Sequence, residues 1–155
     1  MAGLEINFDD DFLKDLLETD SEALCEEMLN ESVPVLEASV KHELRSRIQH
    51  DGDSELVDSI KATKAKKTKD GSAFIVNVTP TGYSKMKTYI DKRTRGTEKK
   101  VRKYQVSNAL KAIWKEYGIP GRQAPAPFFE PASRKSEKQI LSKMQEVYER
   151  KTGIK

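Results

Sequence analysis

The chain has 155 residues, which suits one ordinary domain, and its 36% hydrophobic and 34% charged residues predict one core beneath a highly solvated surface. Its formal net charge is only +3. The lone Cys25 excludes an internal disulfide and favours a reducing compartment, and the longest apolar stretches are far shorter than the roughly 20 residues that cross a bilayer, so we expect no membrane partner.

The charges are unevenly placed along the chain. Residues 1–30 hold ten acidic side chains against the single Lys14, whereas residues 61–105 hold fourteen Lys and Arg against three acids. This asymmetry suits head-to-tail packing of copies, in which an acidic patch meets a basic patch on the next subunit. Neutralisation within one chain, or simple solvation, explains it equally well because salt screens distant surface charges.

The N-terminal part is predicted to be helical. Residues 8–17 place apolar side chains at helical spacing behind three Asp residues, which predicts a short amphipathic helix within an acidic arm of residues 1–20. A long helix follows, from Ser21 to about Gln49. Pro34 interrupts it and predicts either a kink or a restart with Ser32 as cap. Apolar side chains recur at four-residue steps along one face of this helix, at Leu24, Met28, Leu36, Val40, Leu44 and Ile48.

The middle of the chain predicts a small antiparallel sheet. Residues 57–66 and 72–79 have strand composition and flank the turn signal Asp70-Gly71, so we expect a hairpin. Residues 83–90 fit either a further strand or an irregular segment. The lysine- and arginine-rich run at residues 92–103 is expected to be mobile, and it lies within a basic loop at about 83–105.

Two helices are predicted near the C-terminus. The first begins at Ser107 and ends at Gly118, and the second runs from about Ala132 to Arg150. The expected packed side of the first helix consists of Ala109, Leu110, Ile113, Trp114 and Tyr117. The expected apolar face of the second consists of Ile140, Leu141, Met144, Val147 and Tyr148. The fold class is therefore α+β, with residues 21–155 as a single domain.

Catalytic chemistry is poorly supported by the sequence. His42 and His50 have no partners at metal-ligand spacing, and no nucleophile elbow, phosphate-binding loop or dinucleotide fingerprint is present. We expect no catalytic, metal-binding or cofactor-binding residues, and a protein that is not an enzyme.

Nucleic-acid binding is the alternative that the sequence supports better, because basic side chains alternate with Tyr83, Tyr89 and Tyr104. The small net charge and the absence of a recognisable nucleic-acid-binding motif argue against it. The candidate basic contact loop consists of Lys92, Arg93, Arg95, Lys99, Lys100, Arg102 and Lys103.

The most informative stretch joins the two C-terminal helices. It comprises residues 114–118 (Trp-Lys-Glu-Tyr-Gly) and residues 124–132 (Ala-Pro-Ala-Pro-Phe-Phe-Glu-Pro-Ala), which predict a helix stop, a proline-stiffened loop and a helix begun at Pro131. Such an elbow fixes the angle between two helices. Its residues, which are also interface candidates, are Trp114, Tyr117, Gly118, Pro125, Pro127, Phe128, Phe129 and Pro131.

The same stretch resembles a signature of the small tail-component or tail-completion (neck) proteins of long-tailed bacteriophages and prophages, and residues 50–61 resemble the turn that leads into their hairpin. The resemblance covers about residues 21–150, and only the elbow is specific. The acidic first 20 residues and the basic insertion at 83–105 depart from the family pattern.

The resemblance implies a structural protein of head-tail joining or tail completion that has no catalytic residues. It would form a ring on the tail axis, with sixfold symmetry as our expectation, and contact a head-side connector and a tail terminator or tube. It implies a location in the virion, and in the host cytoplasm during assembly. The basic loop would line the lumen, where it could touch phage DNA transiently, or lie against a neighbour's acidic N-terminus.

Overall fold

The computed structural model describes residues 21–48, 54–90 and 101–153, and it confirms the α+β class. The expected helix at residues 8–17 lies outside these ranges. In chain order the described elements are α2 (Ser21–Arg47), α3 (Ser54–Ser59), β1 (Ile60–Ala62), β2 (Lys66–Lys67), β3 (Phe74–Ile75), β4 (Val78–Pro80), β5 (Lys87–Ile90), β6 (Val101–Tyr104), α4 (Asn108–Tyr117) and α5 (Phe129–Thr152).

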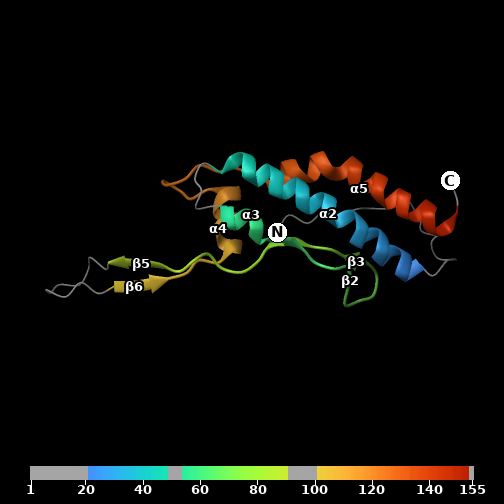
Figure 1. The fold of residues 1–155 in the computed structure, drawn as a ribbon, viewed down its shortest axis with the longest axis horizontal. Coiled ribbons are helices and arrows are strands. Elements are labelled where there is room, and N and C mark those ends of the chain that lie inside the picture. Colours follow the sequence, from blue (N-terminus) through green and yellow to red (C-terminus); the bar gives the residue numbers. More distant parts are fainter. Residues whose placement is uncertain (1–20, 49–53, 91–100, 154–155) are drawn as a thin grey trace.

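The long helices α2 and α5 lie side by side along the molecule, and α3, α4 and the strands lie on one side of this pair (Figure 1). The first residues of α2 pack against the last turns of α5, so the pair is antiparallel. That end of the core consists of Leu24, Met28, Ile140, Met144 and Val147, with Tyr148 packed against it. Leu141, which was predicted to pack, is 44% exposed.

The second cluster of the core brings α2, α3, α4 and α5 together at the other end of the pair. Its buried members are Val40, Leu44, Leu56, Val57, Ile60, Ala112, Phe128 and Ala132. Between the two clusters the helices meet through small polar side chains. Ser39 Oγ donates to the carbonyl of Ala132 over 3.0 Å, and Ser136 Oγ donates to the same carbonyl over 2.8 Å.

Pro34 lies inside a continuous α2, so the predicted restart of the helix at Ser32 is wrong. Ser32 is buried and its Oγ donates to the carbonyl of Leu29 over 3.2 Å, which is a bond within the helix rather than a cap. Proline removes one amide donor from a helix, but packing of Met28 on one side and Val40 on the other holds both segments in place.

The predicted hairpin is present, but its first strand is shorter than expected. Leu56, Val57 and Ile60 are all buried, and their spacing fits a helical turn, so residues 57–59 belong to α3. The antiparallel pairs then run from Ile60↔Pro80 to Lys67↔Phe74.

One strand of the hairpin has one residue more than the other between the two sets of paired residues. Three residues separate Ala62 from Lys66, whereas two separate Ile75 from Val78, and the extra residue is accommodated as a bulge. The buried Ala65 lies in this bulge, and its amide donates to the side chain of Asn30 on α2 over 2.8 Å. The amide of Ala62 likewise donates to Glu37 over 2.7 Å.

Strands β5 and β6 form a second hairpin that projects from one end of the body (Figure 1), and we call these two strands the arm. Of the two alternatives for residues 83–90, the strand is confirmed, because Lys87–Ile90 pair with Val101–Tyr104, and these strands replace both ends of the predicted basic loop at 83–105. Of the seven candidate basic contact residues, Arg102 and Lys103 lie on β6, and the other five lie outside the described residues.

Candidate assembly interface

The elbow between α4 and α5 begins at Gly118, which caps α4 as predicted. Its φ of 76° and ψ of −178° place it in a region that glycine alone occupies readily. A Cβ atom at this position would lie 2.6 Å from the carbonyl oxygen of Gln123 and 2.8 Å from the nitrogen of Pro125. The chain therefore needs a glycine here both for its backbone conformation and for the close approach of the returning loop.

A tight turn follows immediately. Pro120 and Gly121 occupy its two central positions, and the amide of Arg122 donates to the carbonyl of Ile119 over 3.0 Å. Ile119 and Gln123 then exchange two backbone hydrogen bonds, of 2.8 and 2.9 Å. Proline first and a positive-φ glycine second are the residues that such a turn prefers.

The start of α5 is capped by a side chain from α4. Oε2 of Glu116 accepts the amide of Phe128 over 2.9 Å and that of Phe129 over 3.2 Å. A carboxylate at this place satisfies two donors that the first helical turn leaves unpaired, and it complements the helix dipole. The helix consequently begins three residues before the predicted Ala132. No local capping pattern in the sequence reveals this contact, because Phe128 lies twelve positions after Glu116.

The elbow residues differ widely in exposure. Phe128 is fully buried in the core and stacks against Phe129, with ring centroids 4.5 Å apart. Phe128 is therefore a core residue and is excluded as an interface residue. Trp114, Phe129 and Pro131 are half-buried, whereas Pro125 and Pro127 are exposed.

Helix α4 turns three of its large apolar side chains outward, so the predicted packed side of this helix is wrong except at the half-buried Trp114. Ala109 is exposed, and the exposed fractions of Leu110, Ile113 and Tyr117 are 40%, 52% and 68%. The side that packs on the core consists instead of the small or polar residues Asn108 and Ala112. Leu110, Ile113 and Tyr117 recur at helical spacing, and we call them the α4 face.

The N-terminus of α4 is fixed to the base of the arm. Ser107 caps the helix by accepting the amide of Leu110 over 3.2 Å, and it forms an isolated bridge with Tyr83. The side-chain amide of the buried Asn108 donates to the carbonyl of Thr81 over 2.8 Å. The α4 face and the base of the arm therefore keep one orientation relative to each other.

An ion pair between Glu55 of α3 and Lys85 also holds the base of the arm. Nζ of Lys85 lies 2.8 Å from Oε1 of Glu55, and the amide of Lys85 donates to Oε2. The hydrogen bond from Lys85 lowers the pKa of the Glu55 carboxyl, and the same contact raises the pKa of Lys85. Because Lys85 is largely exposed, this pair positions the arm more than it stabilises the fold.

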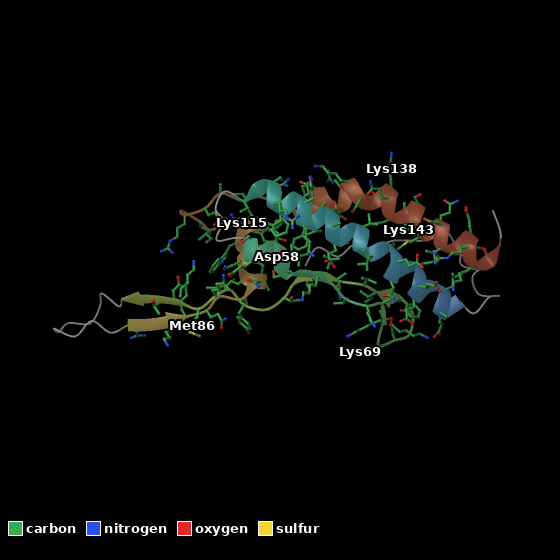
Figure 2. All side chains as sticks on the ribbon, in the orientation of Figure 1. Asp58, Lys69, Met86, Lys115, Lys138 and Lys143 are labelled. Carbon is green, nitrogen blue, oxygen red and sulfur yellow. The ribbon has the colours of Figure 1, made fainter. Side chains whose placement is uncertain are left out.

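Further large apolar side chains are exposed on and beside the arm. Tyr83, Met86 and Tyr104 are 67%, 59% and 44% exposed. Figure 2 shows Met86 at the base of the arm and Lys115 on α4. Arg102 and Lys103 are exposed on β6, so the arm has an apolar base beside basic side chains.

Among the described residues, the most buried carboxylate is Glu43, which joins α2 to α5. Glu43 is 4% exposed and is held by Arg47 on its own helix and by Lys135 of α5, whose Nζ lies 2.5 Å from Oε1. Hydrogen bonds from Lys135 and Arg47 lower the pKa of Glu43 to about 2. A carboxyl group that stays ionised at neutral pH is unsuited to general-acid chemistry.

The histidine and cysteine side chains form no cluster with other ligand residues in the described parts of the chain, where no group of three or more His, Cys, Asp or Glu could hold a metal ion. His42 is exposed, and His50 lies outside the described residues. Cys25 is half-buried. Burial, and then the charge of Glu22, raise the pKa of its thiol, which disfavours the reactive thiolate.

Within residues 21–48, 54–90 and 101–153, no helix combines the length and the apolar character that crossing a membrane requires. Comparison with known proteins found no matching protein-family model, no similar curated protein and no similar solved structure. The function proposed below therefore depends on the residues of this chain and on their arrangement.

Proposed function

We propose that this chain is a non-enzymatic structural protein of a tailed bacteriophage or prophage, which acts in head-tail joining or tail completion as a ring-forming neck or tail subunit. Its partners would be further copies of itself, a head-side connector, and a tail terminator or tube. The ring would be sixfold and located in the virion, after assembly in the host cytoplasm.

The observation that carries this proposal is the outward orientation of the α4 face on a helix that is fixed at both ends. Gly118 and Glu116 hold its C-terminal end, and Ser107 and Asn108 hold its N-terminal end. An apolar face that is exposed and rigidly held is typical of a surface that another protein covers. The resemblance of the elbow sequence to phage neck proteins suggests which kind of assembly would do so.

Cryo-electron microscopy of particles tests the proposal directly. Particles would be purified from an induced lysogen or an infected culture that expresses a tagged copy of the chain. The expected result is a ring of density between head and tail into which the α2–α5 pair and the arm fit. Complete particles that consistently lack the chain would refute the structural role.

Nucleic-acid binding is the second candidate, and the arm is the observation that favours it. Arg102 and Lys103 are exposed on β6, and Tyr83 and Tyr104 are exposed close to them. Basic side chains beside aromatic rings attract phosphate and stack on bases.

Retention of DNA at rising salt discriminates between the two candidates. Phosphate contacts release counterions, so binding that ends well below physiological ionic strength would count against a dedicated nucleic-acid role. The experiment compares an Arg102→Ala, Lys103→Ala variant with a Lys138→Ala, Lys143→Ala control on α5. Nucleic-acid binding would be favoured if DNA is retained at physiological salt by the unchanged chain and the control but not by the variant. Figure 2 shows the control residues on α5.

A further inference from the structure

Helix α4 is strongly amphipathic, yet it packs on its own chain through its small side. Ala112 is its buried apolar side chain, while Leu110, Ile113 and Tyr117 remain exposed. Amphipathic helices ordinarily cover their large apolar residues, because each fully buried side chain of this size contributes about 1.5–3 kcal/mol. Within the part of the chain that the structure describes, the α4 face would therefore gain burial of three large apolar side chains from an additional partner.

The surroundings of the α4 face select a partner of negative charge. Helix α3, which packs against α4, contributes two acids, Glu55, which is paired with Lys85, and the exposed Asp58. The described residues between 82 and 127 carry seven basic side chains and one acidic side chain, Glu116, which caps α5. The seven are Lys85, Lys87, Arg102, Lys103, Lys111, Lys115 and Arg122. An apolar surface surrounded by positive charge is complementary to an acidic amphipathic segment.

The chain contains such a segment at its N-terminus. Residues 1–20 carry seven acidic side chains against Lys14, and residues 8–17 have the pattern of an amphipathic helix. The apolar residues within 8–17 are Phe8, Phe12, Leu13, Leu16 and Leu17. The negative charge of this segment is complementary to the basic surroundings of the α4 face, and its apolar residues recur at the same helical spacing.

The length of the connection favours the N-terminus of another copy over the chain's own. Ala112 of α4 packs in the cluster that contains Val40, which lies 19 residues beyond Ser21, or about 28 Å along α2. The four-residue step from Leu17 to Ser21 spans at most about 14 Å. The helix predicted from the sequence of residues 8–17 would extend about 14 Å further, so only its first turn could reach α4 of the same chain.

A shallow hollow continues the α4 face into the elbow. Tyr117, Ile119, Pro120, Ala124 and Pro125 contribute to its lining. Shallow apolar hollows beside an exposed helix commonly receive an aromatic anchor from the partner, and Phe8 and Phe12 are the aromatic residues of the N-terminal segment.

We propose that the α4 face binds the acidic N-terminal segment, residues 8–17, of a second copy of this chain. The contact is heterologous, since a different surface of each copy takes part, so repetition closes a ring or extends a filament. The inference deepens the ring assembly proposed above, and its biological setting depends on that proposal.

Crosslinking of the full-length chain tests the contact. The test protein carries Leu16→Cys and Ile113→Cys together with Cys25→Ser, which removes the native thiol, and it is treated with a bifunctional thiol reagent. Covalent dimers and larger oligomers are expected. A product closed within one chain, or no crosslink at all, would overturn the proposal. A matched control replaces Ile113→Cys with Leu141→Cys, because Leu141 is similarly exposed on α5 and should give no oligomers.

Sedimentation velocity over a range of concentrations measures the same contact without a crosslink. Ile113→Ser should weaken self-association about 10- to 30-fold, as expected for truncation of a central interface residue. Leu141→Ser should leave it unchanged, and circular dichroism checks that both variants are folded. Equal weakening by both variants would overturn the proposal.

The crosslink and the particle density separate two kinds of failure. If particles contain the ring but positions 16 and 113 do not crosslink, this contact is rejected and the proposed function stands. If positions 16 and 113 crosslink but particles lack the chain, the proposed function is rejected and the contact stands.

Discussion

Replacement of Gly118 by alanine should destabilise the elbow far more than the same change at Gly121. Both glycines have positive φ, 76° and 69°, but they differ in what a Cβ atom would meet. At Gly118 it would lie 2.6 Å from the carbonyl oxygen of Gln123, whereas at Gly121 nothing lies within 4 Å. The pair therefore separates steric overlap from backbone preference.

The magnitudes follow from these two contributions. The backbone region of Gly118 costs a non-glycine residue about 1–3 kcal/mol, and forced overlap with backbone atoms adds about 1–3 kcal/mol. We expect Gly118→Ala to lower the free energy of unfolding by about 4 kcal/mol and Gly121→Ala by about 1–2 kcal/mol. The first is a large part of the roughly 5–15 kcal/mol that stabilises an ordinary domain.

Urea unfolding followed by circular dichroism and by the fluorescence of Trp114, the only tryptophan, measures both effects. With a denaturant dependence of about 2 kcal/mol per molar urea, the midpoint should fall by about 2 M for Gly118→Ala and by less than about 1 M for Gly121→Ala. Trp114 reports on the elbow itself, since its carbonyl accepts the side chain of Gln123 over 3.4 Å. Equal midpoints for the two variants would refute the close approach at Gly118.

Three further predictions address the contacts that hold the helices. Glu116→Ala leaves the amides of Phe128 and Phe129 without their cap and should lower the free energy of unfolding by about 1–2 kcal/mol, measured by urea titration, whereas an unchanged midpoint would contradict the capping role. Phe128→Ala should cost about 3–5 kcal/mol because its ring is fully buried, and a cost no greater than that of Phe129→Ala would refute its central place in the core. Because hydrogen bonds from Lys135 and Arg47 lower the pKa of Glu43 from 4.5 to about 2, its stabilising contribution is complete above pH 4.5 and is lost as pH falls toward 2. Unfolding measured across that pH range should therefore show a shallower acid dependence for Glu43→Gln than for the unchanged chain, and identical slopes would refute this assignment.

Much of the fold could be predicted from periodicity and local signals. The four-residue step through Leu24, Met28, Val40 and Leu44 predicts α2, and all four side chains are buried. Signals for helix starts and stops are equally local, and Ser107 and Gly118 bound α4 as expected. The Asp70-Gly71 turn signal predicts the hairpin correctly. The start of its first strand is predicted wrongly, because apolar residues at 56, 57 and 60 suit a helical turn as well as a strand.

The candidate site was less predictable, because it depends on which surface of a helix the rest of the chain covers. The sequence alone determined that α4 is amphipathic, that an elbow of glycine and proline ends it, and that acidic residues gather in residues 1–30 and basic residues in residues 61–105. Periodicity identifies an apolar face but does not say whether it packs within the chain. Tertiary structure decided that Ala112 faces the core while Ile113 and Tyr117 face outward, and that Glu116 caps a helix twelve residues away. These contacts depend on distances between elements that are remote in sequence, and only the packed chain fixes such distances.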